Sequence, residues 1–90
     1  MNLPACVTIP ADVMSRQVGD ECVLLHLASG NYYGLDPVGT RFWRLVSEGR
    51  KPADACDALL QEYDVAADQL EADIGRLLGE LAERGLVTLS

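Results

Sequence analysis

The sequence has few basic residues, one histidine and no long apolar run. Seven Lys and Arg residues stand against 14 Asp and Glu residues, so the formal net charge is -7. A field of this sign repels nucleic acid and anionic membranes and favours cationic partners. No stretch reaches the roughly 18 apolar residues of a membrane span, and MNLPACVTIPADV lacks the features of a signal peptide. We therefore expect a soluble cytoplasmic protein that binds neither nucleic acid nor membrane.

Cysteines are too few and too scattered for a metal site. Cys6, Cys22 and Cys56 form no CxxC pair, and His26 is the only histidine. This set matches no familiar zinc-ligand spacing, so we expect no metal or other cofactor. An odd cysteine count is typical of the reducing cytosol, where disulfides are rare. We interpret all three as small buried apolar residues.

Catalytic motifs are missing as well. A nucleophile needs a base within reach, and His26 lies in an apolar run, where we expect a structural role and no hydrolytic triad. The glycines at 30, 34 and 39 make no GxGxxG, and no GxxxxGK[ST] phosphate loop is present. The many carboxylates are spread over the surfaces of the predicted helices as on a solvated face. The sequence therefore predicts a protein that is not an enzyme.

The first half of the chain predicts a β-meander. VMSRQV at 13–18 and ECVLLHL at 21–27 are separated by Gly-Asp, which is a hairpin signal. The segment ASG makes the next turn, and NYYGL at 31–35 is the third strand. Because nearly every position of 21–27 is apolar, we expect this strand to be central and covered on both faces. The third strand is expected at an edge of the sheet.

The second half predicts three helices. Asp36-Pro37 is a good N-cap and first-turn pair, and Gly49 ends the first helix. Pro52 opens the second helix, and a longer third helix runs from about residue 66 to residue 84, before Gly85. Its inward-facing residues are predicted to be Leu70, Ile74, Leu77, Leu78 and Leu81. Trp43 lies off the apolar stripe of the first helix, so it could be partly exposed as a docking point, but we favour a residue that covers the edge of the sheet.

These elements predict one α+β domain over residues 1–90. It comprises an arm at 1–12, the β-meander at 13–36, the three helices at 37–85 and a tail at 86–90. A three-stranded antiparallel sheet followed by three helices resembles a winged helix-turn-helix. The longest helix, however, carries five acidic residues against two arginines. Phosphate would repel a recognition helix of this charge.

The third strand raises the question of what its exposed edge binds. Along NYYGL, Tyr33 and Tyr32 point to opposite faces, so only one of them can pack in the core on a given face. The free N–H and C=O groups of such a strand can accept an extended peptide by strand addition. Two alternatives stay open: the tyrosines close the ends of a small core, or the edge pairs with a second copy of the chain.

The stretch GNYYGLDPVGTRFW, followed by LLQEYDV and LLGELAERGLV, closely resembles the PqqD-like family of precursor-peptide recognition elements. The resemblance covers nearly the whole chain, from about residue 13 to residue 87. It implies a non-catalytic adaptor for the leader of a ribosomal precursor peptide, most like the free-standing leader-binding proteins of lasso-peptide pathways. The partners implied are a cysteine-protease-like leader peptidase and an ATP-dependent macrocyclase. The alternatives are a PqqD-like chaperone for a radical-SAM enzyme and a winged-helix transcription regulator.

The resemblance also implies a binding site, because in that family the leader adds beside the third strand and lies against the third helix. On the strand the expected contacts are Asn31, Tyr32, Tyr33, Gly34 and Leu35. Glu71 and Leu78 lie on one flank of the helix, and we prefer the opposite flank, since an apolar floor with an acidic rim suits a leader with aromatic, proline and lysine residues. The helix residues expected there are Asp73, Ile74, Arg76, Leu77 and Glu80.

A proline substitution tests strand addition. At Tyr33 it is expected to delete an N–H of the free edge and to abolish binding while sparing the fold.

Overall fold

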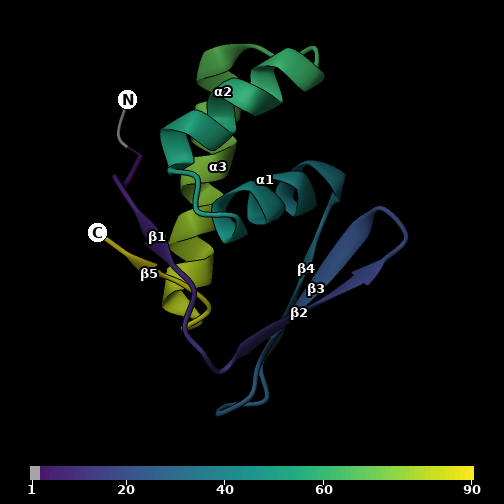
Figure 1. The fold of residues 1–90 in the computed structure, drawn as a ribbon, viewed down its shortest axis with the longest axis vertical. Coiled ribbons are helices and arrows are strands. Elements are labelled where there is room, and N and C mark those ends of the chain that lie inside the picture. The colour runs from purple at the N-terminus through teal and green to yellow at the C-terminus, as the bar shows by residue number, and fades with distance from the viewer. Residues whose placement is uncertain (1–2) are drawn as a thin grey trace.

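In the computed structural model, which describes residues 3–90, three antiparallel strands precede three helices (Figure 1). The strands are β2 (Val13–Val18), β3 (Glu21–His26) and β4 (Tyr32–Leu35), and β3 lies between the other two. The helices are α1 (Pro37–Ser47), α2 (Pro52–Glu62) and α3 (Ala67–Glu83). The predicted fold class and the predicted order of the strands are therefore confirmed.

Short-range signals in the sequence set the ends of these elements. Gly19 opens the β2–β3 turn with a φ of 65°, which suits a two-residue hairpin loop. The Asp36 carboxylate accepts a hydrogen bond from the Gly39 N–H at 2.7 Å and so caps α1. Gly49 and Gly85 follow α1 and α3 with φ values of 98° and 74°, as helix-ending glycines do.

A second, two-stranded sheet joins the two ends of the described chain. Strand β1 (Val7–Thr8) pairs antiparallel with β5 (Thr88–Leu89), and the N–H groups of Ala5 and Cys6 both donate to the Ser90 C=O. The sequence predicts two extended segments here but not their pairing. Nothing in a local pattern reports a contact between segments so far apart in the sequence.

The core has two clusters that meet along α1. One lies between the three helices and includes Phe42, Leu59 and Ile74. The other joins the sheet to α1 and α3 and includes Leu24, Trp43 and Leu81. Trp43 is only 5% exposed and packs against the sheet, which agrees with the favoured interpretation and not with a partly exposed docking point. It lies off the main stripe because α1 packs on two sides, with Trp43 facing the sheet cluster.

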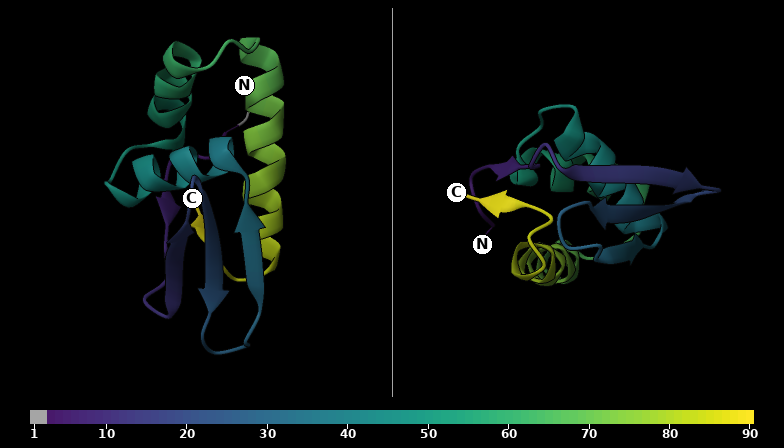
Figure 2. Two further views of the ribbon diagram at one scale, coloured as in Figure 1. Left: turned by 90° about the vertical axis from the view of Figure 1, so that its right-hand side faces the viewer. Right: turned by 90° about the horizontal axis from the view of Figure 1, so that it is seen from below.

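Only one face of the sheet is covered. Cys22 and Leu24 of β3 are buried, whereas Val23 is 36% exposed. The helices lie on one side of the strands (Figure 2), so the expectation that both faces of β3 are covered was wrong. The other side is termed the open sheet face below. It carries Met14, Arg16 and Val18 of β2, Val23 and Leu25 of β3, and Tyr32 of β4.

The cysteines do not share one environment. Cys22 and Cys56 are buried, and burial raises the pKa of the Cys56 thiol to about 11. Cys6 is exposed, so the expectation that all three are buried was wrong for it. Its position just before β1, on a surface segment, leaves its side chain without cover. No helix in residues 3–90 is long and apolar enough to cross a membrane.

His26 lies in a chain of polar contacts that the sequence did not indicate. Its Nε2 is 3.1 Å from the Asp12 carboxylate, and its Nδ1 is 2.7 Å from the Ser29 Oγ. A serine, a histidine and an aspartate thus come together, contrary to the expectation that no such group forms. The Ser29 Oγ also accepts from the Asn31 N–H at 3.3 Å. The contacts tie the β3–β4 turn to the start of β2, which is a structural role.

Candidate functional site

The free edge of β4 is defined by its register with β3. The His26 N–H donates to the Asn31 C=O at 2.8 Å, so these residues form a hydrogen-bonded pair. Such pairs alternate along an antiparallel ladder. The next ones along β4 are therefore Tyr33 opposite Leu24 and Leu35 opposite Cys22. The N–H and C=O groups of Tyr32 and Gly34 point away from β3, toward the free edge.

This register changes two expectations for the strand. The main chains of Asn31, Tyr33 and Leu35 face β3, so only Tyr32 and Gly34 offer free main-chain groups. A proline at Tyr33 would remove a hydrogen bond inside the sheet, so the proposed substitution belongs at Gly34. The error arose because a sequence pattern shows which face a side chain takes but not which way its N–H points.

Helix α3 runs alongside β4 (Figure 2). The Tyr33 side chain joins β4 to α3, since its hydroxyl donates to the Glu80 carboxylate at 3.2 Å. The Arg84 guanidinium lies 5.3 Å from the centre of the Tyr33 ring. Burial raises the pKa of the Tyr33 phenol, and the Glu80 carboxylate raises it further. Tyr32, by contrast, is 72% exposed on the open sheet face.

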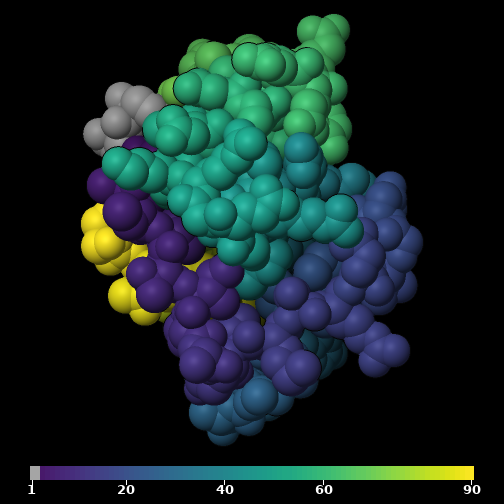
Figure 3. Space-filling view, in the orientation of Figure 1, coloured from purple at the N-terminus to yellow at the C-terminus, as the bar shows by residue number. Residues whose placement is uncertain are grey.

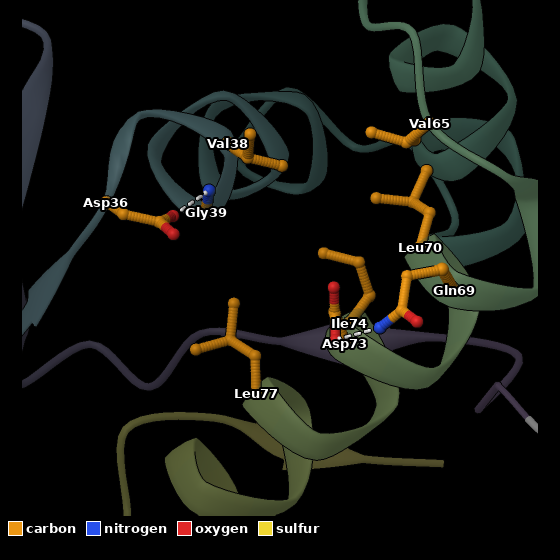
Figure 4. A pocket seen from close by; sticks show the side chains of 9 residues that line it. All are labelled: Asp36, Val38, Gly39, Val65, Gln69, Leu70, Asp73, Ile74 and Leu77. Atoms are coloured by element: carbon orange, nitrogen blue, oxygen red, sulfur yellow. Dashed lines mark hydrogen bonds between the residues drawn. The ribbon is translucent and has the colours of Figure 1, made fainter.

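A pocket lies where β4 leads into α1, and Figure 4 shows its lining. Its volume is about 140 Å³, close to the roughly 150 Å³ cavity that holds a benzene ring. Apolar side chains surround the space, and the carboxylates of Asp36 and Asp73 lie at its rim. The residues that line it are Asp36, Val38, Gly39, Val65, Gln69, Leu70, Asp73, Ile74 and Leu77. The pocket has room for one ring-sized apolar group.

The flank of α3 that the sequence analysis preferred faces the pocket and β4. Leu77 and Asp73 line the pocket, and Glu80 contacts Tyr33. Ile74 is only 2% exposed and belongs to the core beneath the pocket, so it forms floor rather than rim. Arg76 is 70% exposed and pairs with Asp73 at 3.2 Å. On the opposite flank Leu78 is in the core, at 1% exposed.

Sequence reasoning missed the parts of the pocket that come from outside α3. Gly39 lies in the first turn of α1, where a Cβ would come within 3.0 Å of the Asp36 carboxylate and 3.5 Å of Leu77. A glycine inside a helix costs about 1 kcal/mol relative to alanine, so its presence there was a signal of close approach. Val65, an apolar residue between two helices that is 43% exposed, was another.

Strand β2 forms a second free edge, which the sequence analysis did not consider. The Leu27 N–H donates to the Asp12 C=O at 2.9 Å, which fixes the alternation along the β2–β3 ladder. The main-chain groups of Ser15 and Gln17 therefore point away from β3. Within residues 3–90 no strand pairs with this side of β2.

Comparison with known proteins agrees with this architecture. The family model described as "Coenzyme PQQ synthesis protein D (PqqD)" matches residues 21–87. The chain belongs to the PqqD family. Two solved structures share its fold. One, described as TbiB1 in complex with the TbiA(beta) leader peptide, is 42% identical, with a TM-score of 0.84 over 89% of this chain and 93% of that one.

The second solved structure is a lasso peptide synthetase B1 complexed with its leader peptide. It is 28% identical to this PqqD-family chain, and the TM-score is 0.83 over 93% of this chain and 99% of that one. A search of curated proteins gave no match. Both similar structures thus come from complexes with leader peptides.

Proposed function

We propose that this PqqD-family chain is a non-catalytic adaptor that binds the leader of a ribosomal precursor peptide in lasso-peptide biosynthesis. The observation that carries the proposal is the free edge of β4. There Tyr32 and Gly34 offer main-chain groups beside α3, whose side chains line a pocket. Strand addition at such an edge gives affinity with little sequence preference. Both similar solved structures hold leader peptides, and one is named a lasso peptide synthetase, which favours this pathway over a radical-SAM partner.

Specificity would come from the pocket and from the α3 side chains beside β4. A leader strand antiparallel to β4 would have its N-terminal part near the pocket and its C-terminal part near Tyr33. The pocket would take one aromatic or proline side chain, since it offers about 140 Å³ and an apolar floor. Asp73, Leu77 and Glu80 would contact the leader, with Arg76 at the outer rim. The acidic rim would favour lysine residues in the leader.

The adaptor would deliver the bound leader to a cysteine-protease-like leader peptidase, and to the macrocyclase that acts after it. A domain of this kind would supply binding and positioning, while the chemistry would belong to its partners. We also propose the cytoplasm as its location, which is supported by three free thiols at Cys6, Cys22 and Cys56.

The test is fluorescence anisotropy of a labelled leader, taken from the precursor reading frame nearest the gene for this chain. Saturable binding to the folded domain is expected, and it should be lost when the aromatic or proline residues of the leader become alanine. A transcription regulator would instead bind duplex DNA at low salt. Binding of DNA together with indifference to the leader would refute the adaptor function.

A further inference from the structure

Of the features that usually protect a free edge, strand β2 has the charged side chain of Arg16 but few of the others. Edge strands are commonly shortened or bulged, or they carry lysine or proline, so that they do not pair with other chains. Strand β2 pairs with β3 over six consecutive positions without a bulge, and VMSRQV has neither residue. Met14 and Val18 are 56% and 59% exposed. Figure 3 shows this strand, purple grading to blue, at the surface below α1.

The charges beside this edge are cationic and lack anionic partners. Arg16 lies on the open sheet face, and Arg44 of α1 lies on the other side, where its guanidinium bonds to the Gln17 amide oxygen. Among residues 3–90, neither arginine forms an ion pair, whereas Arg41 pairs with Glu62 at 3.0 Å. They are two of the seven basic residues in a chain with a net charge of -7.

Of the acidic groups near β2, Glu48 lies beside Ser15 and Gln17, and the others lie toward the ends of the strand. Glu48, the C-cap residue of α1, shares the lining beside Arg44 but forms no ion pair with it. Asp20 and Glu21 lie at the tip of the hairpin. The middle of the β2 edge, between Ser15 and Gln17, therefore combines free main-chain groups with unpaired positive charge on both faces of the sheet.

We infer that the β2 edge is a second strand-addition site, which binds an extended acidic segment of the enzyme that receives the leader. Successive residues of a strand point to opposite faces. A segment added beside β2 would therefore meet Arg16 and Arg44 with two carboxylates at an odd spacing. Apolar residues of the same segment would cover Met14 and Val18.

This inference rests on the proposed function, because a hand-over requires the enzyme to hold an adaptor whose β4 edge is already occupied. Strand β2 is the other edge of the same sheet, so it stays free when a leader is bound. A second copy of this chain is a poorer occupant. It brings another net charge of -7, and pairing that centres on position 16 would put two Arg16 side chains opposite each other, which is unfavourable.

The experiment uses the leader peptidase encoded beside the gene for this chain. Its affinity for the leader-loaded domain is measured by isothermal titration calorimetry for the wild type, Ser15→Pro and the double variant Arg16→Glu with Arg44→Glu. The Ser15 N–H points away from β3, so proline there removes no hydrogen bond of the sheet. We expect each variant to weaken peptidase binding at least tenfold, while the leader Kd stays within twofold of the wild type.

Amide hydrogen exchange supplies a direct readout that does not depend on a substitution. In the wild type, peptidase binding should slow exchange at Ser15 and Gln17, while Met14 and Arg16 are already protected by β3. The inference is overturned if the peptidase binds both variants as it binds the wild type, or does not bind the loaded wild type. Exchange at Ser15 and Gln17 could also slow when the concentration of the domain is raised without peptidase. That result would assign the β2 edge to a second copy of the chain and would overturn the inference too.

Leader anisotropy separates this inference from the proposed function. A domain that binds no leader contradicts the adaptor function whatever the peptidase does. A second outcome would overturn the β2 inference alone. In it the wild-type domain binds leader, and Tyr32→Ser weakens peptidase binding while Ser15→Pro does not. The enzyme would then bind the open sheet face.

Discussion

Strands β2 and β4 are the two edges of one sheet, and they offer the same main-chain groups in different surroundings. Beside β4 are a helix wall, a ring-sized pocket and the acidic side chains of Asp73 and Glu80. Beside β2 are Arg16, Arg44 and exposed apolar side chains. Main-chain groups make either edge able to accept a strand, and the neighbouring side chains decide which strand it accepts.

The largest effect on leader affinity should come from a proline introduced into β4. Gly34→Pro removes one outward N–H of β4 and places a ring where the leader strand would lie, and a Cβ at Gly34 meets nothing within 4 Å. One main-chain hydrogen bond contributes about 0.5–1.5 kcal/mol, so with the steric block we expect the leader Kd to rise more than tenfold. Anisotropy measures it, and circular dichroism checks the fold.

Ser15→Pro on β2 is the matched control for this substitution. It makes the same chemical change on the other edge and should leave leader affinity unchanged. Equal losses of leader affinity in the two variants would contradict the assignment of the leader to β4.

A smaller effect is expected from a charge placed in the pocket. Leu77→Glu puts a carboxylate on the apolar lining of the pocket. A leader side chain that enters the pocket would bury this carboxylate, which costs about 1–3 kcal/mol. The leader Kd should rise roughly tenfold. Ala72→Glu adds the same charge to an exposed position of α3 and should have little effect. If the two variants bind leader alike, the pocket does not contact the leader.

The two adjacent tyrosines of β4 should differ in their contribution to stability. Tyr33→Phe removes the hydrogen bond to Glu80, which is worth about 1 kcal/mol, or about 4–8 °C in Tm for a domain of this size. Tyr32→Phe removes a hydroxyl from a side chain that is 72% exposed and should leave Tm unchanged. Thermal denaturation of both variants checks the difference, and an equal loss would mean that the bridge contributes nothing.

The smallest effect concerns the ionisation of Tyr33. Its pKa is raised, chiefly by burial and then by Glu80, so the folded state favours the neutral phenol. This contribution to stability is complete below the ordinary tyrosine pKa of about 10 and is lost as pH rises through the higher folded-state pKa. Subtracting the 295 nm titration of Tyr33→Phe from that of the wild type should isolate a phenol that ionises above pH 10. A transition at or below pH 10 would contradict the partial burial of the Tyr33 phenol.

Much of the fold and part of the site could be predicted because their signals are local. Gly19, Asp36 and Gly85 mark turns and helix ends by their own conformational preferences. The helical period places Asp73 and Glu80 on the flank that faces β4, although as leader contacts they stay a prediction. The outcomes that depend on distant segments could not be predicted in this way. They include the pairing of β1 with β5 and the side-chain directions of Asp12 and Ser29, which both contact His26.

The contact of Ala5 and Cys6 with Ser90 has a consequence for engineering. Because these ends already lie side by side, a short linker could close the chain, and new termini could be opened at the Gly19-Asp20 turn. The circularly permuted chain would keep β4, α1 and α3 in one uninterrupted stretch and would carry β2 at its new C-terminus. The β2 edge would then lie at one end of the polypeptide, where it could be truncated or tethered without a change to β4.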